Sequence, residues 1–170
     1  PGTLVVDEDE IVEKEIVSGI AYSRDEAKVT VRQVPDRPGI AAAIFGPLSD
    51  ANVNVDMIVQ NVSADATTDM TFTIGRSDLA RAQAILLAHQ QTIGFAEMIT
   101  DPDVAKISVV GVGMRSHAGV ANTMFRALAD KAINIQVIST SEIKVSVLIA
   151  AEYTELAVRA LHTAYGLDAA

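Results

Sequence analysis

Short runs in which apolar and polar residues alternate precede segments with helical spacing, and this pairing organises the chain. The run KVTVRQV at 28–34 is rich in β-branched residues and predicts a strand. At 40–51 the apolar positions recur every three or four residues, which predicts a helix with one apolar face. Alternation returns at 53–62 and 68–74, and helical spacing returns at 77–91. The predicted order is strand, helix, strand, strand, helix.

The second half of the chain repeats this order, which indicates two copies of one unit. When Lys28 is aligned with Lys106 and the second copy is allowed two extra residues, six of the sixteen positions from Gly39 onward are identical. The identical pairs are Gly39 and Gly119, Ala41 and Ala121, Phe45 and Phe125, Leu48 and Leu128, Asp50 and Asp130, and Asn54 and Asn134. The strands and helices of the second copy are predicted at 106–112, 120–132, 133–140, 144–150 and 152–165.

Two further strand-like runs predict how the units are completed. The run at 95–101 gives the first copy a fourth strand, whereas no such run follows the last helix of the second copy. The run at 15–22 has no role in the first copy, and we expect it to complete the second sheet, because an unpaired edge would invite aggregation. The expected fold is α+β, with two tandem ferredoxin-like βαββαβ domains whose antiparallel sheets carry helices on one face.

This arrangement inserts the first domain within the second. We expect an acidic lead-in at 1–14, the first domain at 24–101, and the second domain at 15–23 plus 102–170. The chain begins at Pro1 without a methionine, which indicates a processed product or a fragment of something longer.

Charge and composition narrow the classes of partner. The net charge of −9 and the pI near 4.7 disfavour nucleic acid, whose phosphates are bound by clustered Lys and Arg. Aromatic residues make up 4% of the chain, too few for a stacking platform. The absence of cysteine excludes disulfides and thiolate metal sites and fits a cytoplasmic location. No run approaches the roughly 18 apolar residues of a membrane span, so no membrane partner is expected.

Catalytic and metal-binding constellations are poorly supported. The three histidines, His89, His117 and His162, are scattered, with no spacing that suits a metal. Ser116 and His117 would act as nucleophile and base only if an acid oriented them, and neighbours in sequence usually point apart. A polar loop is the favoured interpretation of this stretch. We therefore expect no catalytic residue, no metal and no cofactor in this chain.

The stretch PDRPG at 35–39 is the strongest candidate for a binding site. Pro38 suits the first turn of the following helix, and Gly39 lets a small ligand approach the backbone. Unpaired N–H groups at a helix start suit a carboxylate, Asp36 suits an ammonium group, and an α-amino acid carries both. The alternative is a tight strand-to-helix connection in which Asp36 caps the helix. The stretch alone leaves both interpretations open.

Longer stretches resemble the paired ACT domains that form the regulatory half of aspartate kinase. They are DRPG, NVNVDMIVQNVS and TDMTFTI in the first copy, and KISVVGVGMRSHAGV, INIQVISTSEIKVSVLI and AVRALH in the second. The resemblance covers the chain from about Ile16 to Leu167, and QNVS and ISTSEIKVSVLI are specific to this family. Nothing in the chain resembles the amino-acid kinase domain. The sequence therefore looks like a separate regulatory β subunit or an excised regulatory fragment.

The resemblance implies allosteric feedback inhibition of the ATP-dependent phosphorylation of aspartate, the entry step to lysine, threonine and methionine synthesis. Threonine would bind between the first ACT unit of one protomer and the second unit of its partner in a homodimer. Asp36 would hold the ammonium group, backbone groups around Gly39 would take the polar ends, and Gln60 would reach across from the second strand. The residues carried over to this effector site are Asp36, Gly39, Ile40, Ala41, Gln60, Asn134 and Ile135.

The second copy departs from the family pattern at its corner. It reads GMRSHAG, with no aspartate matching Asp36 and no proline before Gly119, so an equivalent threonine site is not expected there. In lysine-sensitive members this loop lies near a lysine site. The resemblance thus offers a second candidate effector site, for lysine, made of Met114, Ser116, His117, Ser141 and Glu142.

The expected macromolecular partners are a second copy of the chain and an aspartate kinase catalytic domain or α subunit. The chain by itself would carry out no turnover. The alternative is an ACT-type regulatory subunit of another biosynthetic enzyme, such as the small subunit of acetolactate synthase. Two tandem copies and the run ISTSEIKVSVLI disfavour that alternative.

Overall fold

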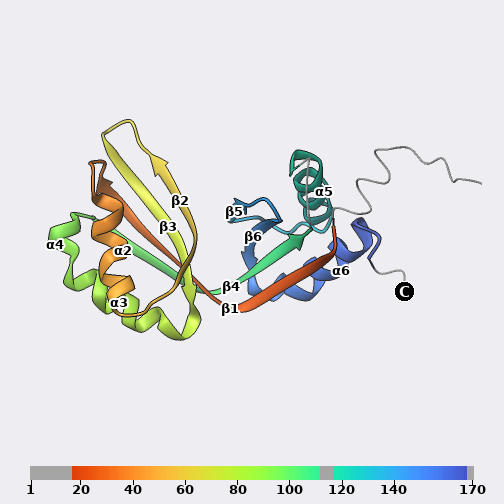
Figure 1. The fold of residues 1–170 in the computed structure, drawn as a ribbon, viewed down its shortest axis with the longest axis horizontal. Helices are drawn as coiled ribbons and strands as arrows, with labels where there is room; N and C mark the ends of the chain where they lie inside the picture. The colour runs from red at the N-terminus through yellow and green to blue at the C-terminus, as the bar shows by residue number, and fades with distance from the viewer. Residues whose placement is uncertain (1–16, 112–116, 168–170) are drawn as a thin grey trace, which may run out of the picture. The chain divides into compact units, whose positions relative to one another are not determined.

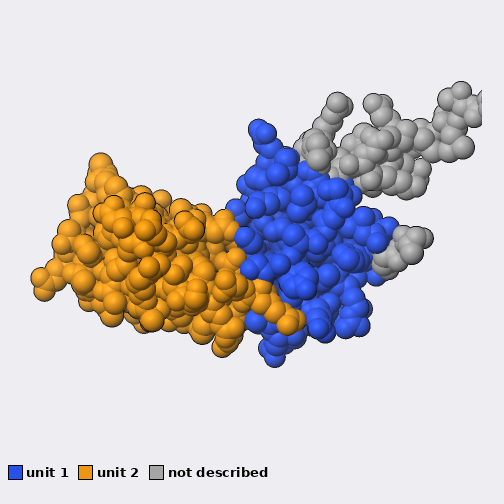
Figure 2. Space-filling view, turned by 60° about the horizontal axis from the view of Figure 1, so that its bottom comes forward, with its two compact units in different colours: residues 1–23, 106–170 blue, residues 24–105 orange. Residues whose placement is uncertain are grey.

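Two sheets, each with helices packed on its apolar face, organise the chain into two units (Figures 1 and 2). The computed structural model describes residues 17–111 and 117–167. Unit 1 comprises residues 1–23 and 106–170, and unit 2 comprises residues 24–105. The strands are β1 (Gly19–Pro35), β2 (Val55–Val62), β3 (Thr67–Gly75), β4 (Glu97–Val110), β5 (Val137–Thr140) and β6 (Lys144–Ala150). The helices are α2 (Ile40–Asp50), α3 (Leu79–Ala88), α4 (Gln90–Ile93), α5 (His117–Asp130) and α6 (Thr154–Ala164), with short 3₁₀ turns η1 (Arg76–Asp78) and η2 (Ala151–Tyr153).

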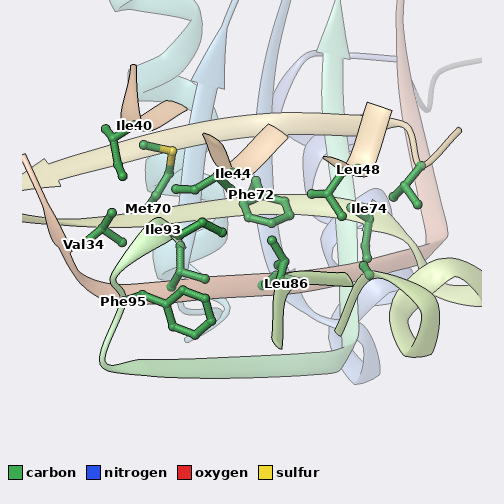
Figure 3. Packing of buried hydrophobic residues seen from close by; sticks show 14 of the residues in the cluster. Val34, Ile40, Ile44, Leu48, Met70, Phe72, Ile74, Leu86, Ile93 and Phe95 are labelled. Atoms are coloured by element: carbon green, nitrogen blue, oxygen red, sulfur yellow. The ribbon is translucent and has the colours of Figure 1, made fainter. Parts of the chain in front are cut away.

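The sheet of unit 2 has the strand order β2-β3-β1-β4. β3 pairs antiparallel with β1 on one side and with β2 on the other. Alternate residues of β3, Met70, Phe72 and Ile74, are buried together with one stripe of α2 formed by Ile40, Ile44 and Leu48. Figure 3 shows Ile40 and Met70 at one end of this cluster and Leu48 and Ile74 at the other. The helix therefore lies along the sheet with its first turn above Met70.

The sheet of unit 1 has the order β1-β4-β6-β5, and β5 pairs antiparallel with β6. Its strands are buried at consecutive positions, at 107–109 on β4 and at 145–149 on β6, with Ile107 and Val109 fully enclosed. The helices α5 and α6 bury one residue per turn, including Met124 and Leu161. The predicted α+β class, with antiparallel sheets and helices on one face, is confirmed in both units.

Two strands are longer than the sequence predicted. We expected separate strands at 15–22 and 28–34, but β1 is one continuous strand through the polar stretch between them. That stretch stays extended because it is paired, with Glu26 in register with Gly75 of β3. The runs predicted at 95–101 and 106–112 are likewise joined in β4. Each long strand contributes one stretch to each unit.

The helix predicted at 77–91 is divided into three pieces. It begins as the 3₁₀ turn η1, continues as α3, and bends at His89 into the single turn of α4. The Nδ1 atom of His89 lies 2.9 Å from the carbonyl oxygen of Ile85. This local contact occupies the carbonyl at the bend, and the chain then leaves α4 through Gly94, whose φ is 88°.

A hydrogen-bonded hydroxyl pair is repeated on the face of each sheet opposite the helices. In unit 2 the hydroxyls of Thr30 and Thr71 lie 2.9 Å apart, and in unit 1 those of Ser108 and Ser146 lie 2.7 Å apart. Thr30 and Ser108 occupy the same position two residues after the aligned Lys28 and Lys106. The repeat detected in the sequence therefore extends to a specific polar contact.

Three glycines with positive φ allow strain and crowding to be measured separately. Gly39 and Gly166 have φ of 87° and 68° with nothing near an added Cβ, so alanine at either is expected to cost about 1–2 kcal/mol from the left-handed backbone alone. An added Cβ at Gly94 would also lie 3.2 Å from Cγ of Pro35. Gly94→Ala should therefore lower the free energy of unfolding more than Gly39→Ala or Gly166→Ala, as measured by urea denaturation. Equal losses for all three variants would show that the Pro35 contact is unimportant.

Tyr165 supplies a pH-dependent contact in unit 1. Its hydroxyl donates a hydrogen bond to the carbonyl oxygen of Val120, and burial raises the pKa of Tyr165. The folded chain therefore keeps this proton more tightly than the unfolded chain, whose tyrosines titrate near about pH 10. The contribution is fully present below that pH and is lost as the pH rises above it. Tyr165→Phe should thus flatten the decline in unfolding free energy between about pH 9 and 11, as measured by urea denaturation at each pH.

Candidate functional site

The corner between β1 and α2 is fixed at its first residue by the neighbouring turn. β1 ends at Pro35, and the backbone N–H of Asp36 donates a hydrogen bond of 3.0 Å to the carbonyl oxygen of Ala66, in the connection between β2 and β3. In the same turn Asp65 accepts a 2.6 Å hydrogen bond from the Thr67 hydroxyl, which lowers the pKa of Asp65. The side chain of Asp36 is exposed. Its carboxylate is thus presented to solvent from a backbone held in place.

Gly39 is the N-cap of α2 and makes the reversal of the chain possible. Its φ of 87° lies in the left-handed region, and nothing lies within 4 Å of the position that a Cβ would occupy. The N–H of Ile40 donates to the carbonyl oxygen of Arg37, and that of Ala43 donates to the carbonyl oxygen of Gly39. The backbone beside Gly39 is therefore both turned sharply and open to a ligand.

Two expectations about this corner were wrong. Asp36 does not cap α2, because the N-cap is Gly39 and no side chain bonds to the helix start. Pro38 does not lie in the first helical turn, because the helix begins at Ile40. Both differences have one cause, since an N-cap at Gly39 places Pro38 outside the helix and leaves Asp36 three residues before the N-cap. The carboxylate of Asp36 is left without a capping role.

The start of α2 retains unused hydrogen-bond donors. Among the residues that the structure describes, no acceptor is found for the backbone N–H groups of Ala41 and Ala42, and both residues are exposed. The first turn carries no acidic side chain that would compete for them. Unpaired N–H groups and the partial positive charge of a helix start favour a carboxylate.

Gln60 lies on the same face of the sheet as the corner helix because of a bulge. The register of β2 against β3 shifts between Asp56 and Val59, and Met57 between them has a φ of 34°. After the shift Gln60 is paired with Met70, above which the first turn of α2 packs (Figure 3). The side chain of Gln60 is exposed. The structure thus brings Gln60 and the start of α2 to one face of unit 2.

The other residues carried over to this site belong to unit 1. Asn134 is exposed and Ile135 is half-buried, and both lie in the connection between α5 and β5. This connection is held by backbone hydrogen bonds from Ile133 to Leu128 and from Gln136 to Leu148. The predicted set therefore falls into two groups, one in each unit, and its assembly across two protomers stays a prediction.

The second candidate set is described only in part. Met114 and Ser116 lie outside the described residues, as does the side chain of His117, at which α5 begins. Ser141 and Glu142 are exposed in the turn between β5 and β6. The Ser141 hydroxyl accepts from the N–H of Lys144 at 3.2 Å and is thus used to shape this turn.

The β5–β6 turn is tied to the start of the second-copy corner. The backbone N–H of Gly111 donates a 2.8 Å hydrogen bond to the carbonyl oxygen of Ile143. Gly111 is the last described residue before 112–116. The turn that carries Ser141 and Glu142 therefore lies beside Gly111.

The two copies differ at the glycine that aligned them. Gly39 precedes α2 as its left-handed N-cap, whereas Gly119 lies inside α5, which begins at His117. α2 starts one residue after Gly39, whereas α5 starts two residues before Gly119, so the second helix starts three residues earlier relative to the glycine. A glycine inside a helix cannot supply the open, turned backbone found at Gly39, which agrees with the expectation that the threonine-type site is not repeated.

Sequence reasoning missed the contacts that hold the corner. Arg37 donates a hydrogen bond from Nη2 to the carbonyl oxygen of Thr92 at 3.1 Å, although the two residues are far apart in the sequence. The acceptor is a backbone atom, so residue type gave no signal for it. Ala66 was missed for the same reason.

The described part of the chain contains neither a metal-binding cluster nor a membrane-spanning helix. Residues 17–111 and 117–167 contain no group of three His, Asp or Glu side chains placed to hold a metal ion. No helix within these ranges has both the length and the apolar content needed to cross a bilayer.

Comparison with known proteins identifies both halves of the chain. The ACT domain family matches residues 29–89 and, through a second model also described as ACT domain, residues 107–165. The chain is 61% identical to an aspartate kinase of Pseudomonas putida and 63% identical to an aspartokinase of Pseudomonas aeruginosa, over 99% of its length in both cases. It spans only 41% and 42% of those two proteins.

Solved structures match over the full length of a regulatory subunit. The regulatory subunit of aspartate kinase from Thermus thermophilus, in a ligand-free form, superimposes with a TM-score of 0.82 at 42% identity, covering 88% of this chain and 98% of that one. A chain from a crystal structure of aspartokinase alpha and beta subunits superimposes with a TM-score of 0.83 at 53% identity, covering 88% of this chain and 99% of that one.

Proposed function

The chain belongs to the aspartate kinase family, as its regulatory region of two ACT domains, and on this premise we propose that it binds threonine and thereby imposes feedback inhibition on aspartate phosphorylation. The observation that carries this proposal is the corner at 36–41. With the adjoining Ala42 it presents an exposed carboxylate, an open left-handed glycine and two unused N–H groups within seven residues. The alternative of an acetolactate synthase subunit is set aside, because the relatives that match the whole chain are aspartate kinases.

The polar groups of the corner complement an α-amino acid. The carboxylate of Asp36 would bind the ammonium group through a charge-assisted hydrogen bond. The N–H groups of Ala41 and Ala42 at the start of α2 would bind the carboxylate of the ligand. The side chain of Ile40 is buried in the core, so this residue would contribute only through its backbone, and the amide of Gln60 would meet the ligand hydroxyl from β2. A small zwitterion with a short polar side chain fits this arrangement better than a long or aromatic one.

The effector site is completed, in this proposal, by a second protomer. Asn134 and Ile135 of unit 1 would close the ligand against the corner of the partner's unit 2. A ligand held by two chains binds the dimer and not the monomer, so that it stabilises the dimer by mass action. The chain would then act in the cytoplasm as a homodimer whose stability depends on threonine.

Regulation would follow from two arrangements of the dimer. The relatives are more than twice as long as this chain, and we infer that the remaining part carries the kinase reaction. Threonine inhibits if it binds more tightly to a dimer arrangement in which the attached catalytic domains or α subunits are poorly active. Lysine would act at the second candidate site beside the β5–β6 turn, around Ser141 and Glu142.

A threonine titration followed by thermal unfolding tests this proposal. At about 100 times its Kd, threonine should stabilise the chain by about 2.7 kcal/mol and raise Tm by about 5–10 °C. Asp36→Asn keeps the shape of the side chain but removes the charge that binds the ammonium group, so it should abolish most of the shift. Sedimentation of the same samples should show a larger dimer fraction with threonine.

The matched control is Asp50→Asn at the exposed C-terminal end of α2. It changes the net charge by the same amount in the same unit and should keep the full threonine shift. An unchanged Tm at millimolar threonine in the wild-type chain would contradict the proposal, as would an Asp36→Asn variant that responds like the wild type. A parallel titration with lysine, alone and with threonine present, separates the two sites, because independent sites give additive shifts.

A further inference from the structure

The corner at 36–39 is held from two sides by different parts of unit 2. On one side the N–H of Asp36 is bound to the carbonyl oxygen of Ala66. On the other side Nη2 of Arg37 donates 3.1 Å to the carbonyl oxygen of Thr92 in α4. The Arg37 bond is made by a side chain, so a single substitution can remove it without altering the backbone of the corner.

The turn that accepts this bond is itself rigidly placed. Ile93 and Phe95, on either side of Gly94, are buried in the core of unit 2. Gly94 is packed so closely against Pro35 that an added Cβ would lie 3.2 Å from Cγ and 3.3 Å from Cδ. The α4 turn therefore makes a firm support for the residue that precedes Asp36, and Thr92 extends this support to the residue that follows it.

The bond from Arg37 orients the corner in a defined way. A guanidinium bound to one of the last carbonyls of a short helix is favoured, because its positive charge meets the partial negative charge of the carbonyl oxygen. The guanidinium of Arg37 is bound to α4 and not to its neighbour Asp36. No ion pair between Arg37 and Asp36 occurs in the described chain. The carboxylate of Asp36 is thus left available on the exposed side of the corner.

We propose that Arg37 is a positioning residue for amino-acid binding, which acts by bracing the corner against α4 and does not touch the ligand. This inference rests on the proposed function of the corner. Without the brace, residues 36–39 would sample other backbone conformations, and the ligand would have to select the competent one. The apparent affinity falls by the fraction of molecules in the competent conformation.

The test compares Arg37→Met and Arg37→Lys with the wild type. Arg37→Met keeps the aliphatic part of the side chain but removes the donors, and we expect the Kd for threonine to rise about three- to tenfold by calorimetric titration. The Tm of the ligand-free chain should change little, because the bond lies on an exposed surface. Arg37→Lys keeps a charged donor and should recover part of the affinity. A residue of purely structural importance would lower Tm and leave Kd unchanged.

A matched control and a second readout separate bracing from charge. Arg81→Met removes an exposed arginine of the same unit that pairs with Asp78, and it should leave the Kd unchanged. The titrations are repeated at a salt concentration of about 0.5 M, at which the Debye length is about 4 Å. A long-range effect of the arginine charge on the Kd would disappear at this salt concentration. The loss in Arg37→Met should persist at that salt concentration. In ligand-free protein, hydrogen exchange at the bonded amides of Asp36, Ile40 and Ala43 should become faster in Arg37→Met and stay unchanged in Arg81→Met.

The outcomes distinguish the positioning role of Arg37 from the proposed threonine binding on which it rests. If the wild type shows no binding of threonine, the proposed function fails and the positioning role fails with it. If the wild type binds and Arg37→Met binds equally well, the corner binds the amino acid without needing the brace, and only the positioning role is overturned. Unchanged hydrogen exchange in the ligand-free Arg37→Met variant would also overturn it.

Discussion

The apolar contact between α2 and the sheet of unit 2 determines the geometry of the corner. Val34 at the end of β1 and Ile40 at the start of α2 are both buried in one core, so neither can move without exposing apolar surface. Five residues connect them, and within this length the chain must leave the strand and begin a helix that packs back on the same sheet. A left-handed residue accomplishes this reversal, and Gly39 adopts that conformation without steric cost. The exposure of Asp36 and of the first helical N–H groups is thus a consequence of core packing.

The same constraint explains why the second copy is not equivalent. Two additional residues precede Gly119 in the second copy, and α5, which begins at His117, extends through the glycine. Helix start, open glycine and carboxylate then no longer coincide. The strands of the two units are alike even in one polar contact, the hydroxyl pair Thr30–Thr71 in unit 2 and Ser108–Ser146 in unit 1. Burial and register constrain both partners of such a pair. No such pairing constrains the connection before α2 or α5, and the two units differ at these helix starts.

Much of the fold could be predicted from the sequence, and the limits have physical reasons. Alternation and helical spacing located the elements because one face of each is buried. They failed at the polar stretch around Glu26, since backbone pairing with Gly75 keeps a strand extended whatever its side chains. At the candidate site, residue types located Asp36 and Gly39 at the corner but left open a capping role for Asp36, which the structure excludes. The brace from Arg37 could not be predicted, because its acceptor is the backbone carbonyl of Thr92 and carries no sequence signal.

A corner held by the core and braced from two sides has a consequence for regulation by a bound amino acid. A ligand shifts an equilibrium only by the difference between its affinities for the two states. In the proposed site, Asp36 and Gly39 lie within one unit, so their contacts with the ligand would be the same in any arrangement of the dimer and would add affinity without favouring one arrangement. The preference must then come from residues whose distance to the corner changes with the arrangement, and in the proposed site these are Asn134 and Ile135. On this reasoning the corner sets how tightly the effector is held, and the α5–β5 connection of the partner decides which arrangement it favours.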